Sequence, residues 1–206
     1  MRIKYQLSLF LIPIALAGMS ACQQSETSST ASAEPVSEKV MPPAAPKASP
    51  FILTASIQDL MTDIVDPSAD YLWDSVVYIG DANGTEQHQP RTDADWLAVK
   101  RKAITLMEAT NLLMMPGRRV VAAGEHMQDE GLEGNLTAAQ IQKLIDDDPA
   151  SFAAFAHALN TAAGQSLQAI KKHDVDALLE AGGTLDEACE ACHLKYWYPN
   201  QGIPQY

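Results

Sequence analysis

Basic residues and cysteines are both scarce in this sequence. Its 206 residues contain 14 lysines and arginines against 26 aspartates and glutamates, so the formal net charge is −12 at pH 7. A surface of that sign repels nucleic acid and anionic membrane surfaces, which we do not expect as partners, and it favours a basic protein partner. Beyond the N-terminal segment, no stretch approaches the 18 apolar residues that a membrane-spanning helix needs.

The signatures of several enzyme classes are missing as well. The sequence has no Ser-His-Asp arrangement and no glycine-rich phosphate-binding loop. Its three cysteines include a single C-x-x-C pair, so the four ligands of a structural zinc site are lacking. These absences leave two cysteine-containing motifs, at Cys22 and at Cys189–His193, as the places where the sequence indicates chemistry.

The N-terminal segment has the features of a secretion signal. Two basic residues precede a short apolar run, Leu9–Ala17, which is too short to span a bilayer permanently. Met19-Ser20-Ala21-Cys22 resembles a bacterial lipobox, in which the signal is removed before the cysteine and that cysteine receives the lipid. We expect residues 1–21 to be a lipoprotein signal peptide and Cys22 to be the lipid attachment site; the alternative is an ordinary signal peptide. Gln23 after the cysteine favours the outer membrane over the inner one, by resemblance to lipoprotein sorting signals.

The segment that follows is low in large apolar side chains. Residues 22–50 are rich in Ser, Ala, Pro and Glu, so burial cannot offset the entropy cost of ordering them. We expect a disordered tether between the lipid and a single domain that occupies residues 51–206.

From Phe51 onward, apolar residues recur with helical spacing, and no run alternates with a period of two between hairpin turns. The sequence therefore predicts an all-α domain. Two capping boxes, Thr92 with Asp95 and Thr137 with Gln140, mark expected helix starts. We expect a shorter helix over 137–145 and four main helical regions, which are 56–79, 92–115, 148–170 and 174–197.

Proline and glycine predict interruptions within two of these regions. Pro67 should break or kink the first region, with Asp66 capping the segment behind it. Residues 80–90 should form a loop. In the last region, Gly182-Gly183 should weaken the helix, and Thr184 should cap its second half.

Cys189, Cys192 and His193 form a C-x-x-C-H motif within the last helical region. At positions i, i+3 and i+4 of a helix, the three side chains project from one face. Two thiols on that face can add to the two vinyl groups along one edge of a haem, and the adjacent imidazole can reach the iron. The motif therefore predicts one covalently attached haem c with His193 as proximal iron ligand.

Other interpretations of the cysteine pair fit less well. A thioredoxin-like redox pair normally opens a helix that follows a strand, whereas this pair lies deep in the last helical region. A disulfide between Cys189 and Cys192 leaves His193 without a role. A haem-free structural lipoprotein with this disulfide is the least favoured alternative.

The segment Ala181–His193, followed by Tyr196, resembles the C-terminal helix of the class II c-type cytochromes, the cytochrome c′ family. The resemblance implies a four-helix bundle with the haem motif in its C-terminal helix. Two positions depart from the family pattern: Glu190 stands where lysine is frequent, and Trp197 stands where a basic residue is frequent.

The resemblance places the distal side of the haem at the first helix. Some family members supply a methionine there and transfer electrons, whereas others leave the position open beside an apolar side chain and bind gases. Met61 is the candidate distal ligand, with plain core packing as its alternative. His126 and His157 are the next candidates.

Together these features predict a periplasm-facing, lipid-anchored cytochrome of the bacterial cell envelope. We expect an electron carrier that is not an enzyme, with a redox partner protein, and we consider a homodimer. The alternative function is that of a five-coordinate haem protein that binds nitric oxide or carbon monoxide.

Overall fold

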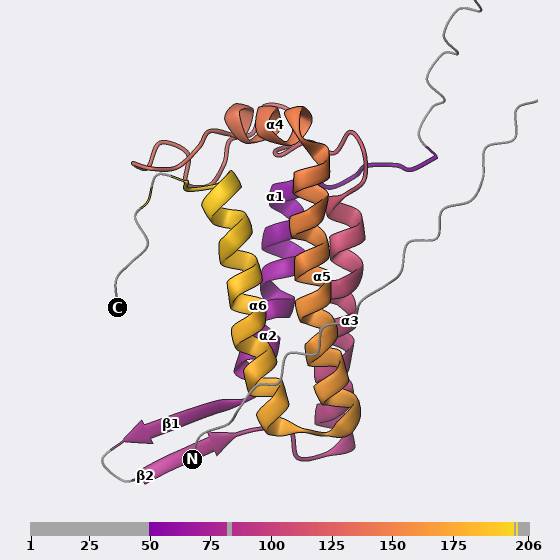
Figure 1. The fold of residues 1–206 in the computed structure, drawn as a ribbon, viewed down its shortest axis with the longest axis vertical. Coiled ribbons are helices and arrows are strands. Elements are labelled where there is room, and N and C mark those ends of the chain that lie inside the picture. The colour runs from indigo at the N-terminus through magenta and orange to yellow at the C-terminus, as the bar shows by residue number, and fades with distance from the viewer. Residues whose placement is uncertain (1–49, 82–83, 200, 202–206) are drawn as a thin grey trace, which may run out of the picture. The chain divides into compact units, whose positions relative to one another are not determined.

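The computed structural model describes residues 50–81, 84–199 and 201 (Figure 1). The predicted signal peptide, Cys22 and the predicted tether up to residue 49 lie outside these residues. Within the described ranges the chain is mostly helical, and no helix is long and apolar enough to cross a membrane. The elements are α1 (Ile57–Leu60), the π-helix η1 (Met61–Val65), α2 (Asp66–Asp74), β1 (Val77–Asp81), β2 (Gly84–His88), α3 (Asp93–Leu113), α4 (Ala138–Asp147), α5 (Pro149–Lys172) and α6 (Val175–Tyr196).

The long helices lie alongside one another, and α4 crosses near one end of them (Figure 1). Helix α5 packs against α3 and α6, and α2 also contacts α3 and α6. Ala103, Leu106, Ala163 and Leu185 are completely buried in the core that these helices share. A second buried cluster includes α4 and borders Met61 and Cys192; its members are Ile57, Leu60, Leu113, Val120, Ile141, Phe152 and Tyr196.

The predicted helix starts are confirmed by their hydrogen bonds. The hydroxyl of Thr92 accepts from the amide of Asp95, and the Asp95 carboxylate accepts from the amide of Thr92. Thr137 and Gln140 form the same reciprocal pair at α4. The carboxylate of Asp148 accepts from the amide of Ser151 and caps α5. Such local patterns are readable from the sequence because each involves residues within one turn.

The prediction of an all-α chain is wrong in one segment, where the structure contains a small hairpin. Strand β1 pairs antiparallel with β2, with Val77 opposite His88, so the expected helix end at Ile79 and the loop over 80–90 are replaced. Tyr78 and Ile79 are exposed, so these residues have no buried face to favour a helix, and their β-branched and aromatic side chains suit a strand. Gly84 adopts a φ of +136°, which other residues rarely do.

Of the break or kink predicted at Pro67, the break is absent, because the chain stays helical from Ile57 to Asp74. The amide of Asp66 donates to the carbonyl of Met61, five residues earlier, so the turn before the proline is a wide π-turn. Asp66 itself has helical backbone angles, and no side-chain cap precedes α2. The cap predicted at Asp66 is therefore wrong.

Helix α6 also continues through Gly182-Gly183, so the cap predicted at Thr184 is wrong. The indole Nε1 of Trp73 donates to the carbonyl of Gly182 at 2.9 Å. A Cβ atom at Gly182 would lie 3.3 Å from Cδ1 of Trp73. Gly182 therefore lets the indole approach the α6 backbone and connect α2 with α6.

The segment 114–137 between α3 and α4 is bonded to the start of α1. The amides of Ile57 and Gln58 donate to the carbonyls of Arg119 and Val120 at 2.8 and 2.9 Å. These bonds satisfy amides that the first turn of a helix leaves free. Buried Arg118 donates to the carbonyls of Leu112 and Ala55. The segment is therefore held against α1, where it covers one side of the cleft described next.

Candidate functional site

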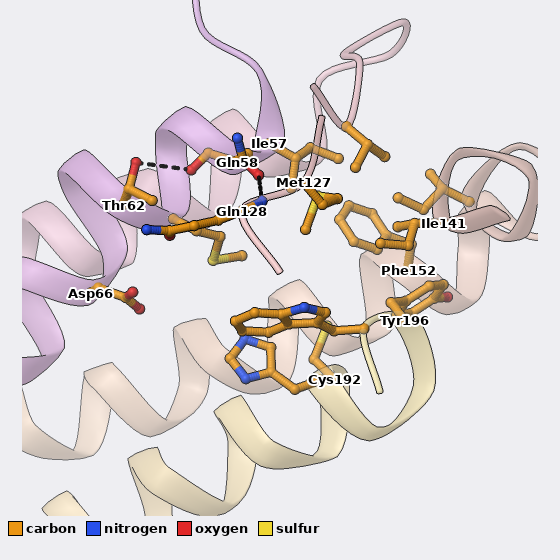
Figure 2. A pocket seen from close by; sticks show the side chains of 15 residues that line it. Ile57, Gln58, Thr62, Asp66, Met127, Gln128, Ile141, Phe152, Cys192 and Tyr196 are labelled. Carbon is orange, nitrogen blue, oxygen red and sulfur yellow. Dashed lines mark hydrogen bonds between the residues drawn. The ribbon is translucent and has the colours of Figure 1, made fainter. Parts of the chain in front are cut away.

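An apolar cleft separates α6 from the first helical segment of the domain. Cys192 and His193 line it from α6, and Met61 lines it from η1. The space between the surrounding atoms, counted out to the open solvent at its mouth, is about 750 Å³. Figure 2 shows Cys192 and Tyr196 on the α6 wall, with Thr62 and Asp66 on the opposite segment.

A smaller cavity adjoins this cleft and brings in the remaining cysteine. It is lined by Cys189 and shares Met61, Cys192 and His193 with the larger cleft. The four haem-site residues predicted from the sequence therefore all line this smaller cavity. Most other side chains that line the larger cleft are apolar, among them Ile57, Val120, Met127, Ile141 and Phe152.

Burial makes both thiols of the motif weakly acidic. Desolvation, helped by the negative charges of Asp186 and Asp66, raises the pKa of Cys189 to about 12. Desolvation also raises the pKa of Cys192 to about 11, against the opposing effect of Lys195. A thioredoxin-like pair needs a lowered thiol pKa to react as a thiolate. Both cysteines are free, and their environment disfavours that redox chemistry.

His193 is half-buried, and its burial favours the neutral imidazole. Desolvation lowers the pKa of its imidazole, and this effect exceeds the opposing influence of Asp66 and Glu190. A neutral imidazole keeps a lone pair on one ring nitrogen, which is the form that binds a metal. Nδ1 of His193 lies 3.5 Å from the hydroxyl of Tyr198, which in turn donates to Glu190 at 2.6 Å.

Asp66 is a member of the cleft that the sequence did not reveal. It lines both cavities together with Met61. Desolvation raises the pKa of Asp66, and attraction to the protonated form of His193 opposes that rise. In a regular α-helix, residues five apart do not share a face; they do so only where a wide π-turn lies between them. Helical periodicity therefore did not predict that Met61 and Asp66 line the same cleft.

The C-terminal end of α6 adds aromatic side chains to the site. Tyr196 packs edge-on against Phe152 and Phe155, with ring centroids 5.3 and 5.8 Å apart. The Tyr196 hydroxyl and the Trp197 indole N–H are buried without a hydrogen-bond partner among the described residues, and both residues line the cleft. Unpaired buried donors of this kind are costly, and a bound molecule with acceptor groups relieves that cost.

These donors fit haem c. The motif offers two thiols and an imidazole from one helix, and Met61 offers a thioether from the other wall. The apolar lining suits a macrocycle, and the unpaired donors of Tyr196 and Trp197 suit its carboxylate groups. The residues present therefore match the chemical groups of a covalently bound haem.

The remaining histidine candidates lie away from the cleft. The side chain of His126 is 82% exposed and lies 3.5 Å from Glu130, and His157 on α5 is exposed. Over residues 50–81, 84–199 and 201, no group of three or more His, Cys, Asp or Glu side chains could together hold a metal ion. The structure therefore brings Met61 to the site and does not bring His126 or His157 to it.

Comparison of the chain with family models, curated proteins and solved structures found no match.

Proposed function

We propose that residues 51–206 form a monohaem c-type cytochrome domain, built as a four-helix bundle with the haem motif in its C-terminal helix. The observation that carries the proposal is that Cys189, Cys192, His193 and Met61 all line the smaller cavity, and all but Cys189 also line the larger cleft. The resemblance of Ala181–His193 to the cytochrome c′ family supports the same function.

The residues of the cleft have distinct roles in this proposal. Cys189 and Cys192 form the thioether bonds that retain the cofactor, and His193 is the proximal ligand. When bound, the haem supplies a one-electron iron couple. The apolar side chains of the cleft exclude water and lower the local dielectric, so that nearby charges and hydrogen bonds affect the potential more strongly.

We propose electron transfer as the function, with Met61 as the distal ligand. Met61 is half-buried, begins the π-turn and lines both cavities. Methionine–histidine ligation raises the potential of a haem and fills the sixth position, which suits an electron carrier rather than an enzyme. Gas binding at an open sixth position is the outcome that would replace this function.

The cellular setting follows from the N-terminal sequence. We propose that Cys22 carries a lipid, that the domain faces the periplasm, and that the outer membrane is its site. The net charge of −12 favours a basic redox partner, since opposite charges steer association.

Acid–acetone extraction tests haem attachment. Protein produced with a c-type maturation system should keep its visible absorbance in the polypeptide fraction, because thioether bonds survive this treatment. The variants Cys189→Ala and Cys192→Ala should each keep at most one thioether bond, and the double variant should lose its haem. Cys22→Ser, which removes the cysteine outside the motif, is the matched control and should keep it. Complete loss of haem from the wild type on extraction would contradict the proposal.

A further inference from the structure

Glu190, Tyr198 and His193 form a short chain of polar contacts beside the cleft. The Tyr198 hydroxyl donates to Oε2 of Glu190 at 2.6 Å. The hydroxyl oxygen of Tyr198 also lies 3.5 Å from Nδ1 of His193. Glu190 and Tyr198 are both half-buried. Water therefore competes less for these groups than at an exposed site.

Tyr198 is positioned by contacts that do not involve its hydroxyl. The backbone amides of Trp197 and Tyr198 both donate to the carbonyl of His193, at 2.8 and 3.0 Å. The amide of Leu136 donates to the carbonyl of Trp197 at 2.8 Å. The Trp197 ring packs edge-on against the imidazole, with centroids 5.0 Å apart and an interplanar angle of 89°. Removal of the hydroxyl alone should therefore leave the tyrosine ring in place.

The available hydrogen-bond donors determine where the protons lie on Glu190, Tyr198 and His193. A carboxylate only accepts hydrogen bonds, and a tyrosine hydroxyl has one hydrogen to donate. Because that hydrogen points to Glu190, the side of the oxygen that faces His193 only accepts. Nδ1 must then be the protonated ring nitrogen, which leaves the lone pair on Nε2.

We propose that Tyr198, together with Glu190, is a positioning residue that keeps the proton of His193 on Nδ1 and lowers the reduction potential of the iron bound at Nε2. This inference rests on the proposed function. Negative charge relayed from Glu190 through the hydroxyl makes the imidazole a stronger electron donor, which favours the more positively charged ferric state.

The test is the reduction potential of haem-loaded protein, measured by spectroscopic titration. Tyr198→Phe removes the hydroxyl, and Glu190→Gln removes the charge at nearly constant shape. Each should shift the iron equilibrium towards the ferrous state by on the order of tenfold, which corresponds to a rise of about 59 mV for a one-electron couple. The double variant should show about the same shift as either single variant, because both act through one chain.

Glu187→Gln is the matched control. Glu187 is exposed on the same helix, three residues earlier, and its substitution removes the same charge. It should leave the potential within the scatter of the wild type. A shift in Glu187→Gln as large as that in Glu190→Gln would assign the effect to net charge and overturn the inference.

The remaining outcomes separate the inference from the function on which it rests. If the wild type holds covalent haem but Tyr198→Phe and Glu190→Gln keep its potential, the inference is overturned and the cytochrome proposal stands. If the wild type holds no haem, both are overturned. Should Tyr198→Phe fail to fold, Glu190→Gln against Glu187→Gln decides the question alone.

Discussion

At the scale of single residues, the site consists of side chains that face one cleft from two helical segments. His193 lies on α6, and Met61 lies at the first position of the π-turn. The thioether sulfur is soft and uncharged, so its burial in an apolar cleft costs little whether or not it binds iron. The environment of Met61 therefore permits both ligation and core packing, and substitution can separate them.

Met61→Ala tests the distal ligand. The wild-type iron should be low-spin in both redox states, because a methionine–histidine pair fills both axial positions. The substitution should give a high-spin spectrum and rapid carbon monoxide binding, measured by visible absorption and flash photolysis. Met127→Ala, which removes another methionine of the same cleft, is the control and should stay low-spin.

Two results would contradict this assignment. A wild type that is already high-spin and binds carbon monoxide readily would favour the gas-binding alternative. A low-spin protein that Met61→Ala leaves unchanged would assign the sixth position to a different side chain.

At the scale of elements, the helices of this chain are set by caps at their ends and by close contacts between them. The Ser56 hydroxyl accepts from the amide of Asp59 and donates to its carboxylate, and that carboxylate also accepts from the amide of Ser56. These bonds begin the helical segment that contains Met61. The contact of Trp73 with Gly182 then connects this segment to α6.

Ser56→Ala should lower the free energy of unfolding by about 1 kcal/mol at pH 7, the usual cost of losing a helix cap. The backbone amide of Ser56 and, second, its hydroxyl lower the pKa of Asp59. The variant keeps the amide, so the pH-dependent part of the difference is the hydroxyl's bond to the carboxylate, which contributes above the ordinary pKa of an aspartate and is lost as the pH falls through the lowered value. Urea unfolding at several pH values measures this. A difference between variant and wild type that persists unchanged at the acid end would contradict the account.

Gly182→Ala and Gly183→Ala form a matched pair on α6. Alanine in place of a helical glycine usually stabilises by about 1 kcal/mol. A Cβ at Gly183 would meet no atom within 4 Å, whereas one at Gly182 would lie 3.3 Å from Trp73. Gly183→Ala should therefore raise the unfolding free energy, and Gly182→Ala should be less stable than Gly183→Ala. Equal stabilities in denaturant unfolding would show that the contact with Trp73 is unimportant.

The sequence predicted those features that depend on neighbouring residues. The caps at Thr92, Thr137 and Asp148 and the grouping of Cys189, Cys192 and His193 on one helix are of this kind. The hairpin at Val77 and the continuity of α6 at Gly182 depend on which side chains find a buried partner elsewhere in the fold. Periodicity does not contain that information, because it records spacing along one segment and not the surface it meets.

Asp66 and Tyr198 were not predicted as site residues, because their positions also depend on more than local spacing. Asp66 enters the cleft because a π-turn shifts the helical face by one residue. Tyr198 reaches His193 because the chain turns at the end of α6. In this turn the backbone amides of Trp197 and Tyr198 both donate to the carbonyl of His193. Neither event has a sequence signature as short as C-x-x-C-H.

At the scale of the whole molecule, the proposal combines an acidic domain with an N-terminal lipid. Cys22→Ser tests the anchor, since the lipid is attached to that sulfur and no described helix can cross a membrane. The wild type should sediment with membranes, and the variant should appear in the soluble periplasmic fraction with its haem intact. A wild type found entirely in the soluble fraction would contradict lipid attachment.

The central claim, that Cys189 and Cys192 hold a haem covalently, is tested most directly by the intact mass of the wild-type protein. After production with a c-type maturation system and denaturation, we expect a mass that exceeds the mass of the processed, lipidated polypeptide by one haem. Peptide mapping should place the added mass on the fragment that contains both cysteines. A mass equal to that of the processed polypeptide, with or without its lipid, and with no haem added would contradict the claim.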